Sequence, residues 1–230
     1  MTGTKVVKLK LEDDGREKLP PLKEDSIVAH VVEVYGQREY RGRFTEIAEY
    51  YDNLLEDIEG LDVRPRQLQR IYDTLEETYP KEPKHVNKLG IFLTALIQKS
   101  TSEEFELKVR KPLGHLGYLL KGGKKITVSG NLGEAAGHCM KDGKLIVKGN
   151  TGDTTGWGLE GGEIILEGNA GKNTAHGMKG GTLHIRGNSG IWTATAMEGG
   201  ILKVDGKIKE ISDDYRSGEI WEGNVRRRPK

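Results

Sequence analysis

The same order of apolar and polar positions returns every 19 residues through the second half of the chain. Four clear copies of this pattern begin at Met140, Leu159, Met178 and Met197. A fixed period of this length is typical of a solenoid, in which each repeat forms one turn and buries its apolar face against the next. Less regular copies extend the pattern in both directions. The sequence therefore predicts a right-handed, single-stranded β-helix of about six turns from Phe105 to Gly206.

Two apolar positions lie two residues apart in each repeat, so in an extended strand they share one face. Because parallel strands stack about 4.8 Å apart, equivalent residues of successive turns form columns. The two predicted core columns are Ile126, Leu145, Ile164, Leu183, Leu202 and Val128, Val147, Leu166, Ile185, Val204. A third apolar column is Leu120, Met140, Leu159, Met178, Met197. Leu and Met share this last column, which indicates core packing and not a cofactor site.

A glycine, followed in four of five turns by an asparagine, marks one corner of every turn. These residues are Gly130, Asn131, Gly149, Asn150, Gly168, Asn169, Gly187, Asn188 and Gly206. A glycine at every turn predicts a backbone with positive φ at that corner. Stacked asparagines predict a hydrogen-bonded ladder along the solenoid axis. We interpret both columns as structural.

One outward position of the repeat is unexpectedly apolar. Ile146 and Ile165 occupy it in adjacent turns, followed by His184, and we predict that they form a docking strip for the N-terminal helices or for another chain.

Two further columns alternate in sign, as expected for solvent-facing residues that fix the register between strands. These columns are Lys141, Glu160, Lys179, Glu198 and Lys148, Glu167, Arg186, Asp205.

Residues 1–102 form a separate, mixed α/β region, and residues 103–230 form the β-helix with a C-terminal cap. The boundary follows the glycines, because 24 of the 32 lie between Gly114 and Gly206. Alternating or β-branched runs predict strands at Val7–Leu11 and Ile27–Tyr35. Apolar residues at helical spacing predict helices at Phe44–Glu59, Pro65–Pro80 and His85–Ser100.

Composition narrows the function classes. A net charge of +1 provides no general attraction to nucleic acid or to an anionic membrane. Cys139 is the only cysteine, which excludes an internal disulfide and a cysteine-based metal site. No secretion signal or membrane-spanning run is evident, so we expect a cytoplasmic protein.

Candidate catalytic groups are few. His138 and His176 share a column with Trp157 between them, and a separation of two turns is too large for one metal ion. Glu134 and Asp153 are the one acid pair that favours carbohydrate chemistry. We predict no catalytic, cofactor or metal site in the chain itself.

The pattern G-N-x-G, a Gly or Ala, then M-x-G-G-x-I appears at Gly149–Gly162 with Leu at the Met position, and in part at Gly168–Gly181. It resembles the GXGXG β-helix superfamily, which includes the β-helical subunit of formylmethanofuran dehydrogenase and the C-terminal domain of the glutamate synthase large subunit. This resemblance implies a non-catalytic structural or assembly subunit of a larger oxidoreductase or amidotransferase complex. The alternatives are a stand-alone carbohydrate enzyme and a self-assembling homo-oligomer. The expected partners are protein subunits or further copies of the chain.

Overall fold

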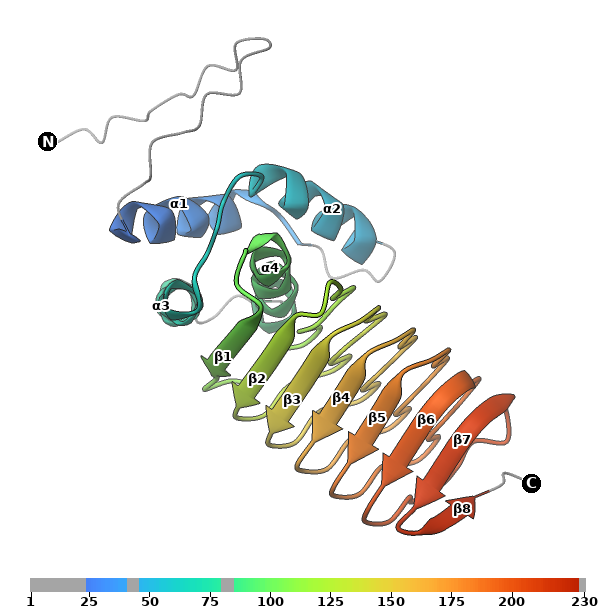
Figure 1. Cartoon of the computed structure of the whole chain (residues 1–230). Coiled ribbons are helices and arrows are strands. Elements are labelled where there is room, and N and C mark those ends of the chain that lie inside the picture. The colour runs from blue at the N-terminus through green and yellow to red at the C-terminus, as the bar shows by residue number, and fades with distance from the viewer. Residues whose placement is uncertain (1–23, 41–45, 80–84, 228–230) are drawn as a thin grey trace, which may run out of the picture.

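The computed structural model describes residues 24–40, 46–79 and 85–227. Within these ranges the chain forms four helices followed by a parallel β-solenoid of about six turns (Figure 1). The helices are α1 (Glu24–Gln37), α2 (Ile47–Asp57), α3 (Pro65–Thr78) and α4 (His85–Lys99). They lie together at the β1 end of the solenoid. The predicted architecture is confirmed, while the handedness of the coil stays a prediction.

Residues 27–35 belong to α1, so the strand predicted there is wrong. The buried side chains of this segment are Val28, Val31, Val34 and Tyr35. Spacings of three and one place them on one face of a helix, whereas a strand would bury every second residue. The Tyr35 ring packs on Phe92 of α4, with centroids 5.0 Å apart. Burial thus overrides the strand preference of a valine-rich run. The other predicted strand, Val7–Leu11, lies outside the described residues.

The other three helices fall within the predicted helical stretches. Helix α3 begins at Pro65, whose fixed φ suits the first turn, and the backbone N–H of Arg64 donates to the Gln67 side chain at 2.8 Å. One stripe of α3 is buried, through Leu68, Ile71, Tyr72 and Leu75. Helix α3 packs against α1, α4 and β1.

The strands are β1 (Glu104–Lys108), β2 (Lys125–Ser129), β3 (Lys144–Lys148), β4 (Glu163–Leu166), β5 (Thr182–Ile185), β6 (Glu198–Val204), β7 (Ser217–Glu222) and β8 (Val225–Arg227). Each pairs with the next in chain order, in parallel from β1 to β7, and β8 pairs antiparallel with β7. The predicted core columns are confirmed, because every member is fully buried. Residue stacks on residue without a shift from β1 through β5.

Helix α4 covers the open side of the first turn. Its side chains provide the hydrogen-bond acceptors that the backbone of a preceding turn would provide elsewhere in the solenoid. The Thr94 hydroxyl accepts a hydrogen bond from the Gly117 N–H at 2.9 Å, and Gln98 accepts from the Lys121 N–H at 3.0 Å. The two backbones approach so closely that a Cβ on Gly90 would lie within 3.0 Å of the Gly114 carbonyl. The helices therefore cap the open edge of the coil.

Helix α3 does the same for the edge strand β1. Gln69 accepts a hydrogen bond from the Lys108 N–H at 2.8 Å, and the Tyr72 hydroxyl accepts one from the Arg110 N–H at 2.7 Å. At the opposite end, β8 folds back on β7 and covers its outer edge with a short, exposed strand that carries Arg226 and Arg227. A short, charged edge discourages further strand addition. Both ends of the solenoid are thus closed.

Candidate functional site

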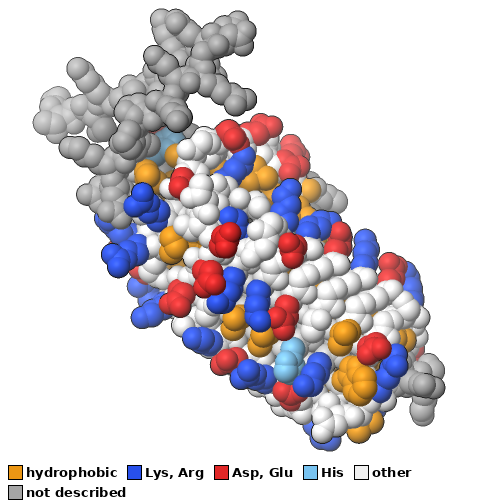
Figure 2. All heavy atoms as spheres, viewed as in Figure 1, with side chains coloured by type: hydrophobic (Ala, Val, Ile, Leu, Met, Phe, Trp, Pro, Cys, Tyr) orange, Lys and Arg blue, Asp and Glu red, His pale blue; other side chains and the backbone are white. Residues whose placement is uncertain are grey.

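The outward face of the strands contains the predicted docking strip. Ile146 of β3 pairs with Ile165 of β4, which pairs with His184 of β5. Both isoleucines are partly exposed. The described helices lie beyond β1, and Figure 2 shows apolar side chains beside a histidine over the middle strands. The strip is therefore an open row across three neighbouring strands.

The row continues through Lys203 of β6 to Trp221 of β7. Trp221 was not identified from the sequence, because the repeat GEIWEGN is one residue shorter than GEIILEGN. The register between β6 and β7 shifts between Glu198 and Ile201, and after this shift Ile220 pairs with Leu202 and Trp221 pairs with Lys203. An alignment of the starts of the two repeats, Gly218 with Gly162, would have placed Trp221 at the Ile165 position and so in the row.

Charged side chains surround the strip. Lys144 Nζ lies 2.6 Å from Glu163 Oε2, and Arg186 Nη1 lies 3.7 Å from Glu167 Oε1. His184 Nε2 lies 2.9 Å from Asp205 Oδ2. Partial burial opposes ionisation of Asp205, but the interactions with His184 and Lys203 together outweigh it and lower the Asp205 pKa. These pairs are partly exposed, so each contributes little to stability.

The asparagine column forms a continuous ladder. Each Asn Oδ1 accepts a hydrogen bond from the backbone N–H of its counterpart in the next turn, at 2.8 Å for Asn131, Asn150 and Asn169. Asn188 continues the ladder to the Lys207 N–H at 2.7 Å. The side-chain amides also donate along the axis, at 3.1 to 3.5 Å. Each asparagine therefore joins two turns.

The reason predicted for the glycines beside this ladder is wrong. Of the five, only Gly130 has a φ in the left-handed region. The others are required by close approach, because a Cβ at each would lie within 3.0 Å of the carbonyl oxygen one turn earlier. The crowded positions are Gly149, Gly168, Gly187 and Gly206. A corner that brings turns so near to each other excludes any side chain.

Left-handed backbone instead marks another side of the coil, at three alternate positions in each turn. In the described residues, ten non-glycine residues have positive φ, and all lie there. They are His115, Leu119, Ala135, Cys139, Thr154, Asn173, Ala175, Trp192, Ala194 and Ala196. Such residues cost roughly 1–2 kcal/mol each, so the surrounding hydrogen bonds between turns must hold them. The left-handed conformation of these positions could not be predicted from the sequence, because they are occupied by Ala, Thr and Trp as well as Gly.

An aromatic row runs along this same side. His138 and Trp157 are stacked, with centroids 4.8 Å apart and ring planes 17° apart. His176 meets the other side of Trp157 edge-on at 5.7 Å. Tyr118 extends the row toward the helices, where Tyr51 of α2 packs on it at 5.2 Å. The row thus links the helical cap to the body of the solenoid.

Burial shifts the pKa values of this row strongly. It lowers the pKa of His138 to about 3, with help from the neighbouring His115, and raises that of Tyr118 to about 12. It also lowers the pKa of His115 and raises that of the Cys139 thiol. His115 and His138 are therefore neutral at neutral pH, and their rings contribute packing to the row.

A buried polar network joins three helices to the solenoid. The Tyr35 hydroxyl lies 2.7 Å from His85 Nδ1, and His85 Nε2 lies 3.0 Å from Glu76 Oε1. The second Glu76 oxygen lies 2.9 Å from Lys111 Nζ, which belongs to the loop after β1. Glu76 and His85 are nearly inaccessible to solvent. This arrangement fixes the orientation of the cap and offers no entry for a substrate.

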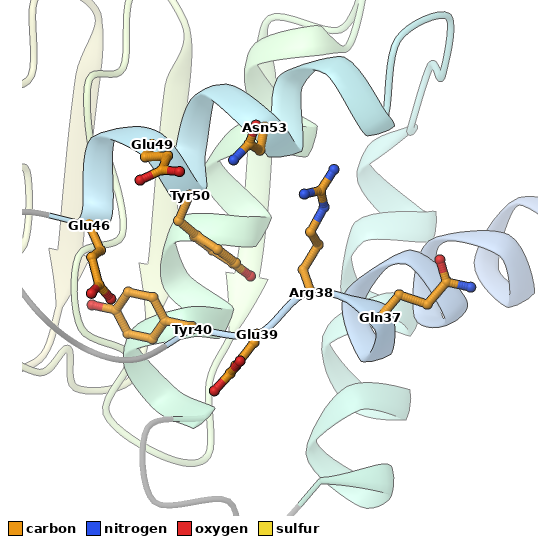
Figure 3. Close-up of a pocket in the computed structure, with 8 residues that line it drawn as sticks. All are labelled: Gln37, Arg38, Glu39, Tyr40, Glu46, Glu49, Tyr50 and Asn53. Atoms are coloured by element: carbon orange, nitrogen blue, oxygen red, sulfur yellow. The ribbon is translucent and has the colours of Figure 1, made fainter.

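A pocket of about 410 Å³ lies between the end of α1 and the start of α2 (Figure 3). Its lining contains the carboxylates Glu39, Glu46 and Glu49 together with Tyr40 and Tyr50. The two tyrosine rings pack at 5.2 Å. Burial and the nearby carboxylates raise the pKa of Tyr40 to about 12. The pocket is acidic, and its arginine, Arg38, is paired with Asp57 at 2.6 Å.

The acid pair singled out from the sequence is engaged in structural contacts. Glu134 Oε1 accepts a hydrogen bond from Asn87 of α4 at 2.7 Å. Asp153 Oδ1 accepts one from the Lys172 N–H of the next turn at 2.8 Å. Both carboxylates therefore help to hold turns or helices together. Among the described residues, no group of three or more His, Cys, Asp and Glu side chains is arranged to hold a metal ion.

No helix in the described part of the chain is long and apolar enough to cross a membrane. No protein-family model matches the chain, and no curated protein or solved structure matches it significantly. The fold and the exposed surfaces are therefore the basis for a functional proposal.

Proposed function

We propose that the chain is a non-catalytic assembly subunit of a larger oxidoreductase or amidotransferase complex, the role implied by its resemblance to the GXGXG β-helix superfamily. The observation that carries the proposal is the closure of the solenoid at both ends. Helices α3 and α4 cap the first turn of the solenoid, and β8 covers β7. Strand addition at either end of a block closed in this way is disfavoured, so we expect partners to bind to its sides.

The sides carry the features expected of contact surfaces. On the strand face, Ile146 and Ile165 form an open apolar row. On the left-handed side, the Trp192 side chain is 47% exposed although its backbone is held at φ 57°. Tryptophan is enriched among residues that dominate binding energy. Two separate apolar features support a scaffold that contacts more than one neighbour.

The carbohydrate-enzyme alternative receives less support. Its acid pair, Glu134 and Asp153, is occupied by Asn87 and by the Lys172 backbone. An acid that holds two turns together is poorly placed to exchange a proton with a substrate. We therefore retain the scaffold as the proposed function.

Purification of the tagged, full chain from its native host tests this proposal. We expect a stoichiometric complex with an oxidoreductase or amidotransferase subunit, and a Trp192→Ala variant that yields less of it. A matched control is Lys179→Ala, which changes an exposed residue outside both apolar features. Reconstitution should show that turnover depends on catalytic residues of the partner. Glycoside cleavage by the isolated chain, lost in Asp153→Asn, would overturn the proposal.

A further inference from the structure

The outward face of β1 to β6 consists of three parallel rows of side chains. The central row is Glu106, Thr127, Ile146, Ile165, His184 and Lys203. The row on one flank is Glu104, Lys125, Lys144, Glu163, Thr182 and Ile201. The row on the other flank is Lys108, Ser129, Lys148, Glu167, Arg186 and Asp205. We call these rows together the strand face.

We propose that the strand face binds the strand face of a second copy of this chain, in an antiparallel dimer. The twofold axis lies between the two faces, parallel to the strands, and passes between β3 and β4. This operation places β1 opposite β6, β2 opposite β5 and β3 opposite β4 of the partner. The proposal rests on the lateral contacts of the proposed function and identifies the occupant of one of them.

The charges of the strand face are self-complementary in this arrangement. Ile146 of one copy faces Ile165 of the other at the centre. Every charged residue that faces another charged residue meets the opposite sign. The facing charged pairs are Glu106 with Lys203, Lys108 with Asp205, Lys144 with Glu163, and Lys148 with Glu167. An isologous interface requires this kind of self-complementarity, and each pair occurs twice.

The same charges disfavour the neighbouring registers. Moving the axis onto β4 places Glu163 and Glu167 opposite their own copies, and Lys148 opposite Arg186. Moving the axis onto β3 places Lys144 and Lys148 opposite their own copies. Like charges directly opposite each other are destabilising, so both shifts are penalised.

A dimer with parallel solenoid axes is also disfavoured. Its twofold axis would run along the solenoid and bring each strand against its own copy. Lys144 would then face Lys148, and Glu163 would face Glu167. Glu106 and Lys203 would each face themselves. The pattern of signs therefore selects both the orientation and the register of the dimer.

The size of the face sets the expected affinity. Strands of five residues span about 16 Å, and six strands span about 24 Å, which gives roughly 400 Å² of face per copy. The total of about 800 Å² is below the 1,200–2,000 Å² of a standard interface. Charges such as Lys144 and Glu163 already form pairs within one chain, so they determine register more than affinity. We expect a weak dimer with a micromolar Kd that weakens as salt rises.

Two single charge reversals test the register directly. Lys148→Glu places a glutamate opposite Glu167 of its copy, and Glu167→Lys places a lysine opposite Lys148. Each variant alone is expected to dimerise at least tenfold more weakly than the wild type. In a mixture of the two variants, every facing pair is again of opposite sign. The mixture should therefore form a heterodimer with a Kd within about threefold of the wild-type value.

Sedimentation velocity over a concentration series of the full chain provides the readout. Lys179→Glu, an exposed reversal outside the strand face, is the matched control and should dimerise as the wild type does. A monomeric wild type at about 100 μM, or a mixture as weak as the single variants, overturns the dimer. A dimer that co-purifies with no enzyme subunit would instead overturn the proposed function and leave this inference standing.

Discussion

Replacing Gly168 with alanine tests why the corner of each turn is glycine. Gly168 does not have a left-handed φ, so an alanine there suffers no backbone strain. Its Cβ would lie within 3.0 Å of the Gly149 carbonyl and of the Asn150 side-chain oxygen. Asn150 Oδ1 is also the acceptor for the Asn169 N–H at 2.8 Å. The substitution therefore forces two turns apart at a rung of the asparagine ladder.

The expected cost follows from three contributions. Crowding of this kind typically costs about 1–3 kcal/mol, and disturbance of the Asn150 hydrogen bond costs about 1 kcal/mol. Alanine also lowers the conformational entropy of the unfolded chain, which stabilises the folded state by about 0.4–1 kcal/mol and offsets part of this cost. We expect Gly168→Ala to lower the free energy of unfolding by roughly 2–3 kcal/mol.

Gly177→Ala is the matched control, because an alanine there meets backbone strain without crowding, whereas an alanine at position 168 meets crowding without backbone strain. Gly177 has φ 57°, but a Cβ there would meet nothing within 4 Å. The equivalent residue one turn later, Ala196, already adopts φ 51°. Strain of about 1–2 kcal/mol, offset by the unfolded-state effect, leaves a cost of about 0.5–1 kcal/mol. Urea unfolding followed by circular dichroism measures both variants. If Gly177→Ala proved as damaging as Gly168→Ala, crowding would not be the reason for the corner glycines.

Three further predictions concern two buried groups and the asparagine ladder. Burial lowers the pKa of His138 to about 3 in the folded chain, from an ordinary value of 6.5. The free energy of unfolding should therefore be highest above about pH 6.5 and should fall by about 1.4 kcal/mol per pH unit between pH 6.5 and pH 3. Urea unfolding at a series of pH values should show this slope, and His138→Gln should reduce it. Glu76→Ala removes the buried partner of both His85 and Lys111 and should cost about 3 kcal/mol in thermal or urea unfolding, whereas Asp73→Ala, which removes a pair with the exposed Arg110, should cost under about 1 kcal/mol. Asn150→Ala should cost about 1–2 kcal/mol and accelerate hydrogen exchange at the Asn169 amide, and unchanged exchange would contradict the ladder.

The periodic part of the chain was predictable because its constraints are local. A 19-residue period and two apolar positions per repeat place Leu145 beside Ile164 without any knowledge of distant residues. The asparagine column could be predicted for the same reason, because identical residues that recur with the period of the turn lie above one another in successive turns. Repetition thus converts a tertiary contact into a sequence pattern.

Other features required the tertiary structure. The run at Ile27–Tyr35 resembles a strand, and burial of Tyr35 against Phe92 makes it a helix. The Glu76–His85 pair joins residues that no spacing rule connects. These positions depend on which helices meet, and contacts between non-repeating segments leave no period in the sequence.

The amino-acid order alone specifies the solenoid, its core columns, its asparagine ladder and the outward position of Ile146 and Ile165. Packing in three dimensions specifies how the coil ends, because Thr94 and Gln98 replace a missing turn through side-chain hydrogen bonds. It also explains why the corner residues are glycine. A sequence can show that Gly168 recurs, but the distance between two turns, and not the φ of one residue, excludes its side chain.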